Sequence, residues 1–76
     1  MRMVRLPELI KKTGLKRATI YKKIKQGLFP APVKIGPKTS VWVESEVDRV
    51  LHSYISGADE EQIKQVVSEI LRSRKS

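Results

Sequence analysis

Two short clusters of apolar residues near the N-terminus each finish at a glycine. The first cluster, at residues 6–10, begins around Pro7, a residue favoured in the first turn of a helix, and Gly14 follows it. A second amphipathic pattern covers residues 16–26, and Gly27 can take the left-handed conformation that closes a helix. The pattern therefore predicts two short helices joined by about three residues, which is the spacing of a helix-turn-helix.

The predicted helix at residues 16–26 has two unlike faces at about 100° of rotation per residue. We expect its packed side to carry the apolar residues, which are Ala18, Ile20, Tyr21 and Ile24. We expect its other side to carry polar and basic residues, which are Lys16, Thr19, Lys22, Lys23 and Gln26. Arg17 falls on the apolar side by angle, so we expect it to reach a phosphate or the first helix. A solvated helix usually mixes glutamates with its lysines, so the acid-free face favours binding to a polyanion.

The chain after this helix is extended, because Pro30 and Pro32 lack amide donors and restrict the residues before them. Two runs of β-forming residues, 33–35 and 41–43, flank a turn at residues 36–39 and predict a small hairpin. We expect its apolar residues to pack against the core, namely Ile35, Val41 and Trp42. We expect its basic and hydroxyl side chains to be available for contact, namely Lys34, Lys38 and Thr39.

Two further helices are predicted in the C-terminal half. The first is indicated by apolar residues spaced along one helical face, which are Val47, Val50, Leu51, Tyr54 and Ile55. Asp59 and Gln62 form a capping-box pattern that starts the second. Its apolar residues repeat the same spacing at Ile63, Val66, Val67, Ile70 and Leu71. We expect this helix to close over the core of its own chain, with pairing to a second copy as the alternative. We expect the tail after Leu71 to fray.

The length of 76 residues suits one small domain. We divide it into residues 1–57 and a C-terminal helix with a basic tail at 58–76, which belongs to the same compact unit or forms a dimer face. The sequence has no cysteine, no apolar run that could span a bilayer and no signal-peptide pattern at its start. We therefore expect a cytoplasmic protein without disulfides and without a membrane partner.

The charge is strongly positive and unevenly distributed. The formal net charge is +8, and residues 1–38 hold eleven of the basic side chains with Glu8 as their only acid. Residues 39–76 hold five basic and seven acidic side chains. Such an asymmetry concentrates a positive field on one half of the molecule and attracts a polyanion. Nucleic acid is the leading candidate partner, and an anionic membrane surface is the lesser one.

Catalytic and metal-binding patterns are absent from the sequence. His52 is the only histidine, and Ser53 and Ser56 share its predicted helix at spacings that cannot form a triad. There is no glycine-rich phosphate loop and no set of metal ligands. We therefore expect no enzymatic activity, no cofactor and no metal site.

Three motifs follow one another between residues 13 and 47. They are Thr19-Ile20-Tyr21, the run GLFPAPV at residues 27–33, and Trp42 followed by Glu-Ser-Glu-Val at residues 44–47. In this combination the chain resembles the AlpA family of prophage regulators, which are winged-helix proteins of the MerR-like, excisionase-related type. The resemblance implies a mainly α fold with a small β-hairpin, a winged helix-turn-helix to which this chain adds a C-terminal helix.

The resemblance also implies a sequence-specific, double-stranded DNA-binding transcriptional regulator from a prophage or genomic island. In that arrangement residues 16–26 enter the major groove and residues 33–43 form the wing. The chain departs from the family at Lys16, where a serine or threonine usually caps the helix, and at Val50, where tryptophan is frequent. Residues from Asp59 onward extend past the usual match.

The candidate DNA-binding residues fall into two groups. Those expected to set the register on phosphates are Lys11, Lys12, Arg17, Lys34 and Lys38. Those expected to face the groove are Lys16, Thr19, Lys22, Lys23 and Gln26, with Tyr21 and Thr39 as further candidates. RNA is a weaker candidate partner, because the aromatic residues are expected to be packed.

The sequence is also compatible with two other functions. An excision factor would bend an attachment site and assist an integrase. A protein-binding inhibitor would use the same basic surface to dock on an acidic protein. Binding to a second copy, as a dimer or a cooperative array on DNA, is compatible with each of them.

Overall fold

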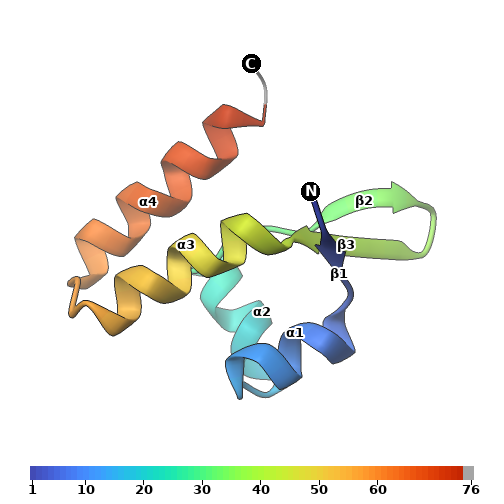
Figure 1. Ribbon diagram of the computed structural model, residues 1–76, viewed down its shortest axis with the longest axis horizontal. Coiled ribbons are helices and arrows are strands. Elements are labelled where there is room, and N and C mark those ends of the chain that lie inside the picture. The colour runs from blue at the N-terminus through green and yellow to red at the C-terminus, as the bar shows by residue number, and fades with distance from the viewer. Residues whose placement is uncertain (75–76) are drawn as a thin grey trace.

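The fold alternates short helices with a small sheet (Figure 1). The computed structural model describes residues 1–74, so Lys75 and Ser76 of the predicted basic tail lie outside the described residues. The elements in chain order are β1 (Met3–Val4), α1 (Leu6–Thr13), α2 (Arg17–Lys25), β2 (Val33–Gly36), β3 (Thr39–Val43), α3 (Glu44–Ile55) and α4 (Glu60–Ser73). This arrangement confirms the predicted fold class, mainly α with a small antiparallel sheet of winged-helix type. None of the helices within residues 1–74 is long and apolar enough to cross a bilayer.

The two N-terminal helices begin and end where the sequence predicts. Pro7 lies in the first turn of α1, and Gly14 closes the helix with a φ of 73° while donating its N–H to the carbonyl of Ile10. The turn between the helices spans residues 14–16, and α2 is followed by Gly27 with a φ of 78°. Positive φ is accessible to glycine at little cost, so both stops are encoded locally.

The predicted hairpin is present, and a third strand completes the sheet. The order is β1-β3-β2, and both pairings are antiparallel. Strand β1 pairs Val4 with Trp42, so both side chains lie on the face that meets the core. The prediction that Ile35 packs is wrong, because the hairpin projects beyond the helices and leaves this residue 57% exposed (Figure 1).

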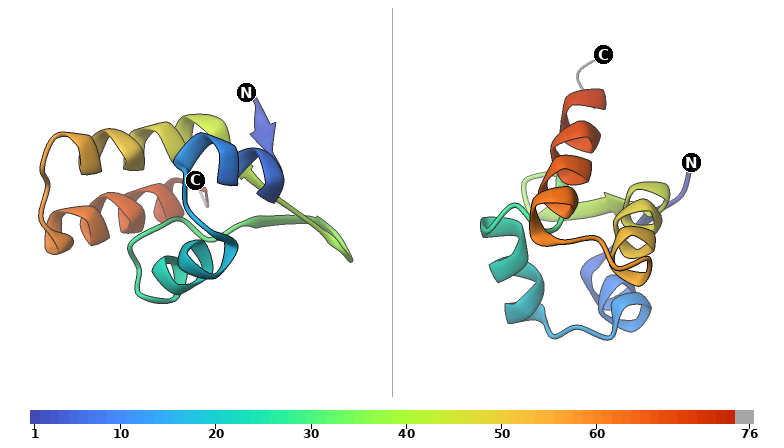
Figure 2. Two further views of the ribbon diagram at one scale, coloured as in Figure 1. Left: turned by 90° about the horizontal axis from the view of Figure 1, so that it is seen from below. Right: turned by 90° about the vertical axis from the view of Figure 1, so that its left-hand side faces the viewer.

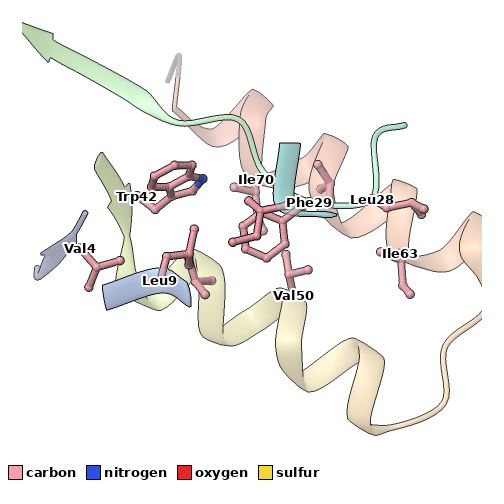
Figure 3. Close-up of a cluster of buried hydrophobic side chains, with 11 residues drawn as sticks. Val4, Leu9, Leu28, Phe29, Trp42, Val50, Ile63 and Ile70 are labelled. Atoms are coloured by element: carbon pink, nitrogen blue, oxygen red, sulfur yellow. The ribbon is translucent and has the colours of Figure 1, made fainter. Parts of the chain in front are cut away.

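The core is one cluster to which every helix contributes (Figure 3). Its largest members are Trp42 and Phe29, and the indole Nε1 of Trp42 donates a hydrogen bond to the carbonyl of Pro30 at 3.0 Å. This bond ties the proline-rich segment to the sheet. Helix α4 adds three buried residues to the same cluster, namely Ile63, Val67 and Ile70. The apolar face of α4 therefore packs within its own chain.

The ends of α3 and α4 differ partly from expectation. The capping box is confirmed, since the Asp59 carboxylate accepts from the Gln62 N–H and the Gln62 side chain accepts from the Asp59 N–H. The prediction of fraying after Leu71 is wrong for residues 72–74, because the Arg74 guanidinium pairs with the Glu46 carboxylate at 2.6 Å. The prediction that Ile55 packs is also wrong. It is the last residue of α3 and is 84% exposed.

Candidate nucleic-acid interface

The exposed face of α2 is rotated from the predicted one. Ile20 is fully buried and Ile24 is half-buried, as expected. The prediction that Ala18 and Tyr21 pack beside them is wrong, because both are exposed. Ala18 precedes Ile20 by two residues, or about 200° of rotation, which places it on the opposite side of the helix. The exposed face consists of Arg17, Ala18, Tyr21, Lys22, Lys25 and Gln26.

Lys23 faces inward, although the sequence pattern predicts it on the binding face. Its Nζ lies 3.5 Å from the Tyr54 hydroxyl and 4.9 Å from the centre of the Tyr54 ring. The same hydroxyl donates to the carbonyl of Leu28 at 2.8 Å. Thr19 is half-buried on this side as well. Lys23 and Thr19 therefore lie at the junction between α2 and the rest of the domain.

Lys25 is the residue of the exposed face that the sequence prediction leaves out. It follows Ile20 by five residues, or about 140° of rotation, and so points away from the core. Had Ile20 and Ile24 alone defined the packed side of the helix, without Ala18 and Tyr21, the pattern would have placed Lys25 on the exposed face. With Lys25 in place of Lys23, the exposed face still carries cations and no carboxylate.

The N-terminal half of α2 combines an aromatic ring with positive charge. Tyr21 is 39% exposed, and the Arg17 guanidinium lies 5.9 Å from the centre of its ring. Lys16 occupies the N-cap position, where no side chain caps the first turn and no acid lies within it. The free N–H groups of that turn add to the positive potential. The exposed ring of Tyr21 could stack on an RNA base, so the expectation that all aromatic residues are packed, which disfavours RNA, is wrong for this residue.

The hairpin presents two exposed cations, and the register of its strands places one of them on the face that meets the core. Lys34 and Lys38 are exposed and Thr39 is half-exposed near the tip. Lys34 pairs with Ser40, two residues before Trp42 on β3, so its side chain shares the sheet face of Trp42. That face meets the core residues of α1 and α2. Helix α2 and the hairpin tip both lie away from α3, on the lower side of the left-hand view in Figure 2.

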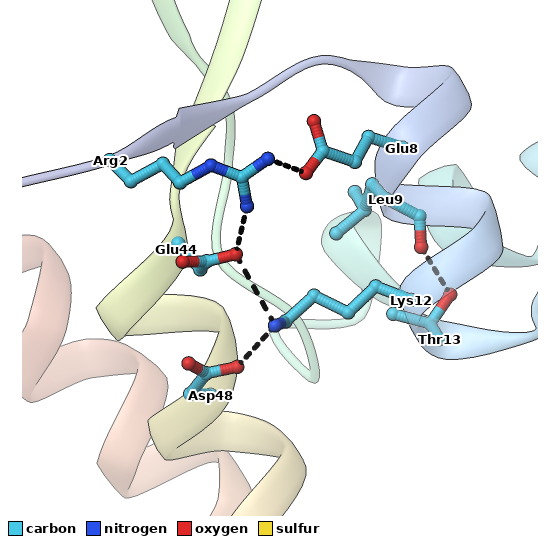
Figure 4. Close-up of polar contacts among 7 residues, drawn as sticks. All are labelled: Arg2, Glu8, Leu9, Lys12, Thr13, Glu44 and Asp48. Carbon is cyan, nitrogen blue, oxygen red and sulfur yellow. Dashed lines mark hydrogen bonds and ion pairs between the residues drawn. The ribbon is translucent and has the colours of Figure 1, made fainter.

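Lys12 is held in an ion-pair network instead of facing solvent freely (Figure 4). Its Nζ lies 2.8 Å from a carboxylate oxygen of Asp48 and 3.5 Å from one of Glu44. Arg2 pairs with Glu8 and, at 2.5 Å, with Glu44. The hydrogen bond that Lys12 donates to the Asp48 carboxylate raises the pKa of Lys12, and the bond that Arg2 donates to the Glu8 carboxylate raises the pKa of Arg2. The network joins Arg2, which precedes β1, and helix α1 to α3. The neighbouring Lys11 is exposed, and among residues 1–74 no carboxylate lies within 4.0 Å of it.

The ion pairs of residues 1–74 join the N-terminal segment, α1, α3 and the end of α4, and none of them involves α2 or the hairpin. The paired carboxylates all contact lysine or arginine side chains that lie outside α2 and the hairpin. These carboxylates belong to Glu8, Glu44, Glu46, Asp48 and Glu69. Within residues 1–74, no lysine or arginine of α2 or the hairpin has a carboxylate within 4.0 Å. The positive field predicted for the first half of the chain is therefore concentrated on α2 and the hairpin.

His52 is exposed on α3, and no three potential metal-ligating side chains of residues 1–74 lie close enough to hold an ion.

The family described as "Prophage CP4-57 regulatory protein (AlpA)" matches residues 2–55 of this chain. An uncharacterised protein, ORF88 of enterobacteria phage P4, is 41% identical over 56 residues, which cover 74% of this chain and 64% of the phage protein. The chain thus spans less than two thirds of that relative. The DNA-binding transcriptional activator AlpA of Escherichia coli K12 is 39% identical over 57 residues, covering 67% of this chain and 81% of the relative. No solved structure gives a significant match.

Proposed function

The chain belongs to the AlpA family of prophage regulatory proteins, and from this premise we propose that it is a sequence-specific regulator of transcription that binds double-stranded DNA. The name of its E. coli relative, a DNA-binding transcriptional activator, supports the proposal. Such a protein acts in the cytoplasm, where the DNA of its host lies. The observation that carries the proposal is the exposed face of α2, which joins three cations to a tyrosine and a glutamine without any carboxylate.

In the proposed mechanism α2 lies in the major groove, which is wide enough to admit a helix. Lys22 and Lys25 would meet guanine edges or phosphates, and Gln26 would meet an adenine edge. Arg17 and Tyr21 would contact the strand at the N-terminal end of α2, where Lys16 and the free N–H groups attract a phosphate.

The hairpin acts as the wing in this mechanism. Lys34, Lys38 and Thr39 would lie along the neighbouring backbone, and Lys11 would reach it from the end of α1. Relative to the candidates predicted from the sequence, the proposal adds Lys25. It omits Lys12, Lys23 and Thr19, because their side chains are turned toward other parts of the domain.

Cooperation between copies is part of the proposal. A single module of this size buries roughly 600–1,000 Å² of its own surface on DNA, which is little for specific control. We propose that two copies occupy neighbouring sites. In the alternative role the protein bends an attachment site beside an integrase, and this role differs from promoter regulation in the process that it changes. It would change the excision of the element, whereas a promoter regulator would change the level of a transcript.

The salt dependence of duplex binding tests the proposal. With about five phosphates neutralised, the logarithm of the association constant should fall with the logarithm of salt concentration at a slope of about −4.5. Fluorescence anisotropy with a labelled 30-base-pair duplex, repeated between 50 and 200 mM salt, measures this slope. A slope near zero would contradict the proposal, and equal binding to an acidic polypeptide would point to the inhibitor function instead.

Lys11 and Lys12 provide a matched pair of variants on one helix. Lys11→Gln is expected to make the salt slope shallower by about 0.9, because it removes one phosphate contact. Lys12→Gln is expected to leave the slope unchanged and to lower the melting temperature, because Lys12 is paired with Asp48. Anisotropy titrations and thermal melting separate the two effects. Equal losses of slope in both variants would show that Lys12 leaves its carboxylates to contact DNA.

A further inference from the structure

Helix α4 lies beyond the residues matched by the family and is nevertheless fixed to the domain. The match ends at residue 55, and α4 begins at Glu60. Ile63, Val67 and Ile70 are buried in the common core. Two ion pairs with α3 hold the outer turns, Arg49 with Glu69 and Glu46 with Arg74, each at 2.6 Å. The outer surface of α4 therefore keeps a fixed position relative to α2.

One flank of α4 adjoins the C-terminal end of α2. A shallow groove of about 370 Å³ is lined there by Gly27, Lys64, Val67, Ser68, Leu71 and Arg72. The Cγ of Lys64 lies 3.8 Å from the position that a β-carbon on Gly27 would occupy, so the lysine stem rests against the end of α2. From this point α4 continues past the end of α2 (Figure 1; Figure 2, right-hand view). The flank thus begins beside the C-terminal end of α2 and runs on beyond it.

The same flank carries unpaired positive charge. Lys64, Ser68 and Arg72 follow one another at intervals of four residues and are all exposed. Among the residues that the structure describes, neither Lys64 nor Arg72 has a carboxylate within 4.0 Å. The acids of the first turn, Glu60 and Glu61, lie at the opposite end of α4 from Arg72.

The length of the flank suits a nucleic-acid backbone. Eight residues of helix separate Lys64 from Arg72, or about 12 Å at 1.5 Å per residue. One strand of DNA carries a charge about every 3.4 Å along the helix axis, so this length spans several phosphates. A backbone that runs past the C-terminal end of α2 would meet the two cations in turn.

We propose that Lys64, Ser68 and Arg72 form an auxiliary phosphate-binding strip, which holds the DNA backbone adjoining the site of α2. The inference rests on the proposed function, since it takes duplex DNA as the partner of α2. The strip contacts phosphates and reads no bases, so it adds affinity and fixes the register of α2 on the duplex. It gives α4 a role in binding as well as in packing.

The test compares two double variants that change the net charge equally. Lys64→Gln with Arg72→Gln removes both cations of the strip. Ser45→Glu with Gln65→Glu makes the same change in net charge on other parts of the surface, where Ser45 is exposed in the first turn of α3 and Gln65 lines a separate groove. Thermal melting first establishes that both variants are folded, and anisotropy then measures binding to a 30-base-pair duplex.

The strip variant is expected to bind about tenfold or more weakly at 0.1 M salt, with a slope shallower by about 1.8, since two phosphate contacts are lost. The control variant is expected to keep the wild-type slope. Equal slopes in the strip variant and the wild type would overturn the strip and leave the function of α2 intact. Equal losses in both variants would also overturn it, because the effect would then come from overall charge. A wild-type protein that binds no duplex would overturn both proposals.

Discussion

Replacing both Lys22 and Lys25 with glutamate is expected to abolish binding of the protein to duplex DNA. Both side chains are exposed on α2, and no carboxylate of residues 1–74 lies within 4.0 Å of either. The double change converts two attractions to phosphates into two repulsions at the centre of the proposed interface. Because each lost phosphate contact alone removes about 0.9 from the salt slope, the affinity at 0.1 M salt should fall by more than about 100-fold.

Anisotropy titration measures the loss, and circular dichroism verifies that the helices remain. Lys23→Gln and Lys25→Gln are the matched controls, since they make the same change two residues apart on one helix. Lys25→Gln should weaken binding, whereas Lys23→Gln should preserve the salt slope, because Lys23 lies against Tyr54. Full binding by the Lys22→Glu, Lys25→Glu protein would eliminate α2 as the DNA-binding element.

Removing α4 is expected to unfold the protein. A chain ending at residue 58 loses the three buried side chains of α4, each of which stabilises the fold by roughly 1.5–3 kcal/mol. The total of roughly 5–9 kcal/mol is similar to the whole stability of a small domain. Thermal melting by circular dichroism should therefore show no cooperative transition in the truncated chain.

Two substitutions in the full-length chain refine this test. Val67→Asp places a charge in the core and should unfold the protein, whereas Gln65→Asp adds the same charge to an exposed position of α4 and should leave it folded. A truncated chain that melts cooperatively, and loses only cooperative binding to DNA, would instead assign α4 to contacts between copies.

The ends of the helices could be predicted from the sequence because their signals are local. Pro7 and Gly14 delimit α1, and the Asp59–Gln62 capping box starts α4. The motifs between residues 13 and 47 also identified the family, whose match covers residues 2–55. Strand β1 could not be predicted in this way, since its two residues form no pattern and its partner β3 lies about forty residues further along the chain.

The orientation of side chains on α2 was harder to predict. The helix has nine residues, and only two of them, Ile20 and Ile24, define its packed side. Alanine and tyrosine are often exposed in proteins. A prediction that counts Ala18 and Tyr21 as packed therefore rotates the expected binding face of α2 away from the observed one. The pairing of Lys12 with Asp48 could not be predicted either, because it depends on how α1 packs against α3. Contacts of individual residues with bases remain predictions.

The surface that carries the ion pairs, outside α2 and the hairpin, affects how closely copies of the protein can bind along one duplex. The charges of carboxylates and basic side chains cancel there in ion pairs, such as Arg2 with Glu44 and Arg49 with Glu69. At 0.1 M salt, charges interact appreciably only within about 10 Å, so mutual repulsion between adjacent bound molecules depends on the surfaces that they turn toward each other. Neighbours that meet through these balanced surfaces would incur little Coulombic penalty, although each protein carries a net charge of +8.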